Sequence, residues 1–343
     1  MFVIAKISEN SWLFVPVRGG DWMKYRFPGV LAVASTVTIA LLSSGCATSS
    51  GAASPSVELH NVTVGAVPVA DAAALYIAQQ RGLFQAQGLN VKIETIVSGA
   101  DAITGQLAGR YDVVFGNYVS YILADALHKD TFRVLAPGAA DSANDSALVV
   151  PPHSPIQTVA GLRGKTIGVN APNNIATVFI DALLSANAMG VQQDHIHLVP
   201  IPFPAMSHAL QTHQIDAAWL VEPFVTYAEM SGATPLVDTD QGATQNLPLG
   251  GYMVTQSWEK KYPGTAAAFR RALLQGQEIA SSDLPAVWHG VEKFAKIPSS
   301  VAGLMALPSY PLVMQPSELQ RVANLMLLYN MLGQNYDTNQ MLR

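Results

Sequence analysis

At 343 residues the chain is long enough for two domains of ordinary size, each with its own buried core. Half of its residues are hydrophobic and only 13% are charged, which excludes an intrinsically disordered chain. The net charge is −5 and the 19 Lys and Arg residues form no cluster, so no nucleic-acid partner is expected.

The N-terminal segment has the layout of a secretory signal. Residues 23–26 (MKYR) are a short basic start, residues 27–42 are apolar, and Ser-Ser-Gly at 43–45 precedes Cys46, the one cysteine of the chain. The apolar run is short for a membrane span, and small residues before a cleavage site are typical of signal peptides. We therefore expect residues 1–46 to be an N-terminal extension and a lipoprotein signal peptide, with lipidation at Cys46 and Met23 as an alternative start. A core cysteine behind an uncleaved anchor helix is the other interpretation.

Strands and helices alternate in the first part of the folded region. The small, polar segment 47–60 predicts a flexible tether. Hydrophobic periodicity then predicts a strand at 62–66, a helix at 72–80, a strand at 91–94, a helix at 101–107 and a strand at 111–115.

The same order returns further along the chain. The pattern predicts a strand at 166–169, a helix at 175–188, a strand at 197–199, a helix at 207–212 and a strand at 215–219. Strands separated by helices form parallel sheets with right-handed crossovers, so two such series indicate two α/β lobes.

The last part of the chain is helical. Apolar residues recur with helical period in 265–279, 284–296 and 318–332. A helical tail of this kind is expected to pack on the first lobe, which requires the chain to cross between the lobes twice. These crossings are expected near 148–150 and 250–252, so lobe 1 comprises 61–149 and 251–343, and lobe 2 comprises 150–250.

Several short motifs, in this order and spacing, resemble the SsuA/THI5-like (NMT1) family of solute-binding proteins. They are LYIAQQRGLF at 75–84, GLNV at 88–91, YDV at 111–113 with GN at 116–117, SPI at 154–156, GLRGK at 161–165, and IDA at 215–217 with Trp219 and EPF at 222–224. The resemblance runs from about residue 62 to residue 254.

The resemblance implies a fold and a role. The fold is the two-lobed periplasmic-binding-protein-like fold of type II, an α/β class with two crossovers and a helical C-terminal segment on lobe 1. The role is that of an extracytoplasmic, lipid-anchored receptor that hands a small solute to an ABC permease and, through it, to the ATPase. We expect a monomer without a cofactor.

Candidate ligand-binding residues follow the predicted strands, because ligands of open parallel sheets bind beyond the carboxyl ends of the strands. Asp71, Ser98 and Asn117 offer polar groups, and Gly99 allows close approach of the backbone to a ligand. A helix start at 173–177 offers free N–H groups to an anion. The full set of candidates is Asp71, Ser98, Gly99, Asn117, Tyr118, Asn173, Asn174, Thr177, Phe203, Trp219, Glu222 and Tyr252.

Each candidate also has a structural interpretation. Asp71, Asn173 and Asn174 are residue types that cap helices, and Ser98 with Gly99 is ordinary turn chemistry. Glu222 fits a salt bridge that stabilises one state of a hinge as well as it fits ligand contact. The aromatic candidates are also of the type that fills a core.

The charges near the expected cleft bear on the solute. No Lys or Arg follows a predicted strand, since Arg110 and Lys165 precede theirs. Asp71 and Glu222 favour a nitrogen-bearing solute, because a desolvated carboxylate needs a donor. The prediction is therefore a nitrogen heterocycle of the thiamine-precursor kind, or an alkanesulfonate or taurine held at the helix start.

Two other functions remain as alternatives. Thiamine-pyrimidine synthases of the same family are enzymes with a cysteine-rich iron motif, which this chain lacks. A metal-binding solute receptor would need His195, His197, His208 and His213 brought together from separate segments. The main hypothesis is a binding protein that is not an enzyme and holds no metal.

Overall fold

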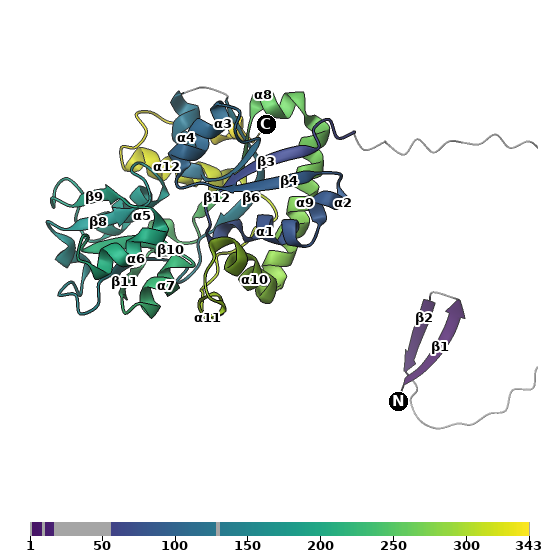
Figure 1. Ribbon diagram of the computed structural model, residues 1–343, viewed down its shortest axis with the longest axis horizontal. Helices are drawn as coiled ribbons and strands as arrows, with labels where there is room; N and C mark the ends of the chain where they lie inside the picture. The colour runs from purple at the N-terminus through teal and green to yellow at the C-terminus, as the bar shows by residue number, and fades with distance from the viewer. Residues whose placement is uncertain (1, 9–10, 17–55, 128–130, 343) are drawn as a thin grey trace, which may run out of the picture. The chain divides into compact units, whose positions relative to one another are not determined.

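The computed structural model describes residues 2–8, 11–16, 56–127 and 131–342 (Figure 1). Its contacts divide the chain into two units, residues 1–51 and 52–343. In the first unit, strands β1 (Phe2–Ser8) and β2 (Ser11–Pro16) pair antiparallel. The expected signal peptide and Cys46 lie outside the described residues, so lipidation stays a prediction.

The second unit contains two five-stranded sheets (Figure 1). The first sheet has the strand order β4-β3-β5-β12-β6 and the second has the order β11-β7-β10-β8-β9. The strands of the first sheet are β3 (Asn61–Ala66), β4 (Asn90–Thr95), β5 (Val113–Asn117), β6 (Phe132–Ala140) and β12 (Pro248–Thr255). Those of the second sheet are β7 (Ser146–Val150), β8 (Thr166–Val169), β9 (His197–Pro200), β10 (Ala217–Val221) and β11 (Thr234–Asp238).

The two sheets have the same topology. In the first sheet β3 pairs parallel with β4 and β5, and in the second β8 pairs parallel with β9 and β10. Each sheet also holds one antiparallel strand, β12 in the first and β7 in the second. In each sheet, this antiparallel strand is the first one that the chain forms after it crosses from the other sheet. The two series of strands and helices predicted from the sequence are confirmed.

The chain crosses between the sheets in residues 141–145 and 239–247. The expected lobe boundaries, 149/150 and 250/251, fall inside β7 and β12 and therefore do not mark the crossings. The reason is that both crossings are short and lead directly into strands that are buried along almost their whole length. The apolar stretches that were interpreted as crossings are these buried strands.

Helices connect and cover the strands. Around the first sheet these are η1 (Ala70–Ala72), α1 (Ala73–Gln80), α2 (Leu83–Ala86), α3 (Gly99–Leu107), α4 (Tyr118–Leu127) and α8 (Gln256–Lys261). Around the second sheet they are η2 (Val159–Leu162), α5 (Ile175–Ala186), α6 (Phe203–Gln211), α7 (Phe224–Met230) and η3 (Gly242–Thr244). The tail contains α9 (Pro263–Ser282), α10 (Leu284–Ala295), α11 (Ser299–Ala302), α12 (Pro316–Leu328) and η4 (Thr338–Met341).

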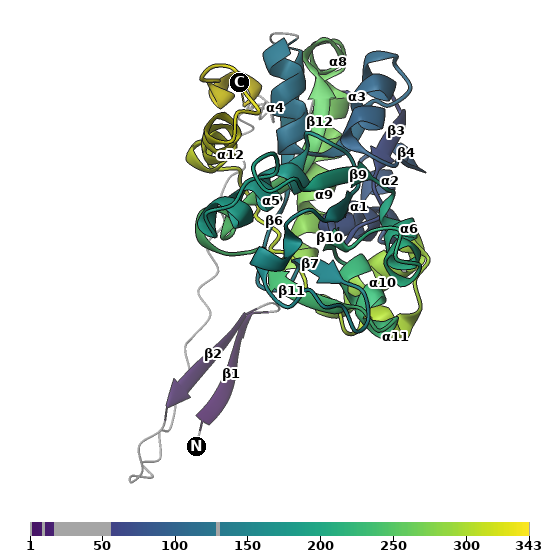
Figure 2. The ribbon, with the colours of Figure 1, turned by 90° about the vertical axis from the view of Figure 1, so that its left-hand side faces the viewer.

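The helical tail packs mainly on the first sheet and its helices, as predicted. Helix α9 lies against α1, α2 and β6, and α10 lies against α1. Helix α12 lies beside α4 in both views (Figures 1 and 2). One part of the tail departs from the prediction, since α11 contacts α7 beside the second sheet.

The segment expected to be a tether is described from Ser56 onward, and there it is held in place. The Glu58 carboxylate accepts hydrogen bonds from the backbone N–H groups of Gly264 and Thr265, at 3.0 and 2.9 Å. The Leu59 N–H donates to the Thr265 hydroxyl at 2.9 Å. Residues 56–60 therefore belong to the folded unit, because Glu58 satisfies N–H groups in the first turn of α9.

The contact between α1 and α9 yields a prediction. Gly276 has no room for a side chain, because an added Cβ would collide with the Ala74 carbonyl oxygen of α1. We expect Gly276→Ala to lower the free energy of unfolding by about 1–3 kcal/mol, since overpacking outweighs the better helix propensity of Ala. Chemical denaturation measures the change.

Gly303→Ala is the matched control for that substitution. Gly303 is exposed, and its added Cβ meets only the Ser299 carbonyl oxygen at 3.7 Å. We expect a change within about 0.5 kcal/mol. Equal effects of the two substitutions would contradict the close packing of α9 on α1.

Candidate ligand-binding site

A cavity lies between the two sheets at the carboxyl ends of their parallel strands. Its empty space amounts to about 530 Å³, with the open solvent at its mouth included. Its wall is mostly apolar. The position agrees with the rule that open parallel sheets bind ligands beyond the carboxyl ends of their strands.

The first sheet and its loops contribute one side of the cavity. Asp71 comes from η1 after β3, Gly99 begins α3 after β4, and Asn117 ends β5. Apolar residues and further backbone complete this side: Val67, Val69, Ile96, Phe115, Gly116, Leu249 and Gly250. Asn117 also anchors α4, since its Oδ1 accepts a hydrogen bond from the Ser120 N–H at 2.8 Å.

The second sheet contributes the opposite side, which is largely aromatic. The lining residues here are Asn170, Ile175, Phe203, Trp219 and Val221. The Phe203 ring lies 5.6 Å from the Phe224 ring and 6.4 Å from the Trp219 ring. The Trp219 indole N–H donates to the Thr239 hydroxyl at 3.2 Å, which fixes the ring. Such a wall suits a flat ring or an apolar body.

Asp71 is the one ionisable residue among those that line the cavity in the described part of the chain. Its side chain is buried, with 7% of the residue exposed, and its Oδ1 accepts no hydrogen bond within the described protein. Burial raises the pKa of Asp71 to about 7. Asp71 lines the cavity, and a buried carboxyl oxygen without a donor is a place where a ligand donor would bind.

Three more acidic side chains are buried where the chain crosses between the sheets. Asp141 and Asp145 lie on the first crossing, and Glu222 follows β10. Burial raises the pKa of Asp141 to about 8 and that of Glu222 to about 7. Burial also raises the pKa of Asp145 well above its usual range, and the charges of Asp71, Asp141 and Glu222 raise it further. Near neutral pH this group of four carboxyls therefore holds protons.

Glu222 connects four segments at the crossing. Its carboxylate accepts hydrogen bonds from the Thr226 hydroxyl at 2.7 Å and from the Ala306 N–H at 3.2 Å. Its backbone N–H donates to the Asp145 carbonyl at 3.1 Å, and its carbonyl accepts from the Ala70 N–H at 2.9 Å. The residue before Asp71 is thus tied to the end of β10 in the second sheet.

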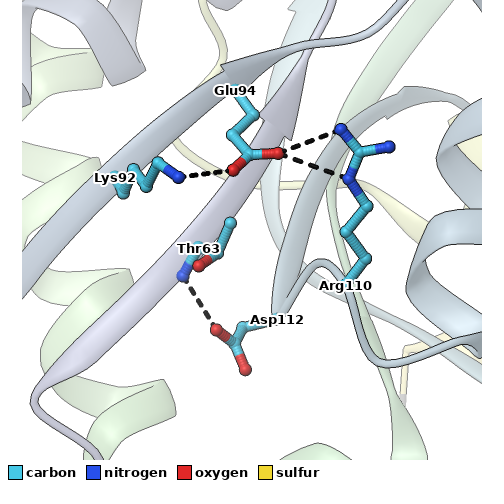
Figure 3. A network of polar contacts seen from close by, with 5 residues as sticks. All are labelled: Thr63, Lys92, Glu94, Arg110 and Asp112. Atoms are coloured by element: carbon cyan, nitrogen blue, oxygen red, sulfur yellow. Dashed lines mark hydrogen bonds and ion pairs between the residues drawn. The ribbon is translucent and has the colours of Figure 1, made fainter.

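The cations noted in the sequence lie at the opposite ends of the strands. Figure 3 shows Glu94 between Lys92 and Arg110, at 2.7 and 3.2 Å, and Asp112 beside the Thr63 N–H at 2.8 Å. Lys165, which precedes β8, pairs with Asp216 at 3.5 Å. Arg110 and Lys165 are therefore held in ion pairs at the amino ends of their strands, as their sequence positions predicted.

The structure separates the predicted site residues into three groups. Those that line the cavity are Asp71, Gly99, Asn117, Phe203 and Trp219. Those that lie elsewhere in the core or at the crossing are Tyr118, Thr177, Glu222 and Tyr252. Those that cap helices or lie in a turn are Ser98, Asn173 and Asn174.

Capping explains two of the residues outside the cavity. Ser98 accepts from the Asp101 N–H at 3.3 Å, and Asn174 accepts from the Ala176 N–H at 3.1 Å. The same residue types serve as caps and as ligand contacts, so the sequence could not separate the two roles. Asp71, by contrast, does not cap a helix, because no side chain caps η1 or α1.

The buried aromatic candidates fill the core of the first sheet. Tyr118 was expected in a loop but is the first residue of α4, and its hydroxyl points at Gly251. Tyr252 is buried in β12 with its ring 5.2 Å from that of Phe115. Neither side chain lines the cavity, although the ring of Tyr252 packs against that of Phe115, which does.

Sequence reasoning missed several lining residues. Asn170 follows β8 directly, so the same strand-end rule could have found it. Its Oδ1 accepts from the Asn174 side-chain amide at 2.6 Å, which links the cavity to the start of α5. The apolar residues Val67, Val69, Ile96 and Val221 carried no signal, because they are of the type that fills any core.

The four histidines of the alternative metal hypothesis are exposed on the surface of the second lobe. His195 and His213 lie in turns with positive φ, His197 begins β9 and His208 lies on α6. In the described ranges, no group of three or more His, Cys, Asp or Glu side chains is arranged to hold a metal ion. Of the helices described, none combines the length and the apolar character needed to cross a membrane.

Comparison with known structures defines the class of fold. The alkanesulfonate-binding protein SsuA of Xanthomonas axonopodis pv. citri, bound to MOPS, superposes with a TM-score of 0.71 at 16% identity. The match covers 84% of this chain and 99% of SsuA. The fold is therefore that of the periplasmic binding proteins, with two sheets of five strands.

The chain belongs to the NMT1/THI5-like family, whose model matches residues 69–283. The taurine-binding periplasmic protein of Escherichia coli K12 is 28% identical over 255 residues, which are 73% of this chain and 74% of that protein. The nitrate import ATP-binding protein NrtC of Synechocystis is 25% identical over 237 residues, which are 64% of this chain. The match spans only 35% of the length of NrtC.

The buried carboxyls predict how stability depends on pH. Asp71 and Glu222 have reference pKa values of 3.8 and 4.5, against about 7 in the folded protein. Between pH 4 and about 7 the folded protein therefore binds more protons than the unfolded chain, so its stability falls as the pH rises. We expect the melting temperature without solute to fall by at least about 5 °C from pH 5 to pH 8.

Asp145→Asn tests the origin of that fall. The substitution removes one of the crowded carboxyls, so we expect a higher melting temperature than that of the unchanged chain at pH 8 and a shallower pH dependence. Asp101→Asn, an exposed acid on α3, is the control and should leave the dependence unchanged. A melting temperature that rises from pH 5 to pH 8 would contradict the raised pKa values of the buried carboxyls.

Proposed function

We propose that the chain is the solute-binding component of an ABC importer. It captures a small organic solute in the cavity between the two sheets and delivers it to a membrane permease, which is coupled to an ATPase. The observation that carries the proposal is the apolar and aromatic cavity, to which the parallel strands of both sheets contribute residues. The relatives named for binding taurine and alkanesulfonate support it.

The mechanism is closure of two lobes on the solute. A solute that contacts Asp71 and Asn117 on one side and Phe203 and Trp219 on the other stabilises the arrangement in which both sides are close. The two crossings, 141–145 and 239–247, are the connections about which such a movement would occur. The permease would then distinguish the loaded form from the open form.

The proposal also covers the localisation of the protein and the class of its solute. We infer an extracytoplasmic protein, anchored by a lipid on Cys46, that acts as a monomer and carries out no catalysis. The solute is a nitrogen heterocycle of the thiamine-precursor kind, or an alkanesulfonate or taurine. The apolar wall fits the ring or chain of either, and the polar groups of Asp71, Asn117 and Asn170 fit its substituents.

A thermal-shift panel tests the receptor function. The panel contains taurine, alkanesulfonates, nitrate, aminopyrimidines and divalent metals. A solute at a hundred times its dissociation constant adds about 2.7 kcal/mol to the free energy of unfolding, so the melting temperature should rise by several degrees with one organic class. A shift with divalent metals alone would contradict the cavity as the binding site.

A substitution in the cavity wall tests whether the solute that raises the melting temperature binds in this cavity. Ile175→Phe places a larger side chain in the space between the sheets, so we expect the solute-dependent shift to disappear. The melting temperature without solute should change by only a few degrees. Val97→Phe, at an exposed apolar residue, is the control and should retain the shift.

A further inference from the structure

Asp71 has one carboxyl oxygen without a partner, in a cavity that is otherwise uncharged. Its Oδ1 accepts no hydrogen bond within the described protein, although the residue is more than nine-tenths buried. The other lining residues in the described ranges include no Lys, Arg or His. A ligand that binds in contact with Asp71 must therefore bring the donor that this oxygen lacks, or Asp71 must be protonated.

The buried groups behind Asp71 favour a cation over an anion. Asp141, Asp145 and Glu222 are buried nearby, and in the described part of the chain none of them forms an ion pair with Lys or Arg. None of the three can offer a positive charge to an anionic group. When one of them loses its proton as the pH rises, it repels an anion and attracts a cation, and the low-dielectric surroundings strengthen both effects.

The aromatic wall of the cavity also favours a cation. Phe115, Phe203 and Trp219 line the cavity with Asp71. The faces of such rings attract a cation by their quadrupole, and they pack against the apolar body to which the cationic nitrogen is attached. A carboxylate beside aromatic rings is thus a site for an organic cation.

We propose that Asp71 is the counter-ion of a protonated nitrogen in the solute, so that the site selects amines and other cationic nitrogen compounds against anions that lack a protonatable nitrogen. This inference rests on the receptor function proposed above and narrows its solute class. Taurine and a protonated aminopyrimidine satisfy the requirement, whereas isethionate, the hydroxyl analogue of taurine, and nitrate do not.

If Asp71 binds the solute in its protonated form, the site prefers anions instead of cations. The experiment must distinguish these two cases. A protonated Asp71 would donate to an oxygen of an anion, and binding would strengthen as the pH falls. With a cationic ligand, binding requires the carboxylate and weakens as the pH falls below about 7. The ionisable groups whose pKa values respond to Asp71 are Tyr76 on α1, Tyr252 on β12, Tyr310 before α12, and Asp141 and Asp145 on the first crossing. Glu222 acts on Asp145.

The pH experiment uses matched pairs of probes. Taurine is compared with isethionate, and benzylamine with benzyl alcohol and benzenesulfonate, each by calorimetry at pH 7.5 and 5.5. We expect the amine of each set to bind and its partner without an amine to bind at least about tenfold more weakly. The affinity of the amine should fall about tenfold or more at the lower pH.

Asp71→Asn keeps the shape of the side chain and removes its charge. We expect it to weaken amine binding by about 10- to 100-fold and to abolish its pH dependence. Asp101→Asn is the control with the same change of charge. Because Asp71→Asn removes a buried carboxyl, its melting temperature without solute at pH 8 should equal or exceed that of the unchanged chain, which shows that the variant folds.

Three results would overturn the inference. They are tighter binding of isethionate, benzenesulfonate or nitrate than of the amines, binding that strengthens at pH 5.5, and amine binding that survives Asp71→Asn. A small-molecule extract of bacterial cells is a further probe, with the retained compound identified by mass spectrometry. A retained compound with a protonatable nitrogen supports the inference, and a retained anion without one overturns it, whereas retention of nothing overturns the receptor function itself.

Discussion

The hydrogen bonds of Glu222 hold the loop of the first lobe that carries Asp71 against the end of β10 in the second sheet. They join Ala70 and Asp145 through the backbone, and Thr226 and Ala306 through the carboxylate. Because these bonds are buried, the ends of the strands from both sheets meet at one place, and the cavity forms beside it. An unpaired backbone group there would be costly, so the crossing keeps a defined geometry. The closure of the lobes proposed above would take place around this point.

The same crossing sets the electrostatics of the cavity. Four carboxyls are buried there, and the cations that flank the strands are paired at the opposite ends. These carboxyls are protonated near neutral pH because burial raises their pKa values. As the pH rises and they ionise, the free energy of unfolding falls. A cavity with this background and aromatic walls has little attraction for a bare anion. The protein shares its fold with the alkanesulfonate-binding protein SsuA, but no Lys or Arg of the described residues lines its cavity.

Hydrophobic periodicity was sufficient to predict the parallel strands and the helices between them, because both series alternate clearly in the sequence. It failed at β7 and β12, since a strand buried on all sides has the same composition as a short apolar crossing. The strand-end rule placed Asp71, Gly99, Asn117, Phe203 and Trp219 at the cavity, because the carboxyl ends of parallel strands meet at one edge. It could not separate Ser98 and Asn174, which cap helices, from ligand contacts, nor the lining valines from the core. Glu222 lies at the crossing between the sheets, and its partners include backbone groups distant in sequence, which no local pattern reveals.

A crystal structure of the protein with the solute that it retains from a cell extract tests the central claim most directly. We expect the solute to lie between the two sheets, with a nitrogen about 2.7–3.2 Å from the Asp71 Oδ1 and an apolar or aromatic body against Phe203 and Trp219. A solute bound elsewhere, or one that places a sulfonate, nitrate or other anionic group without a protonatable nitrogen against Asp71, would contradict the proposed role of Asp71.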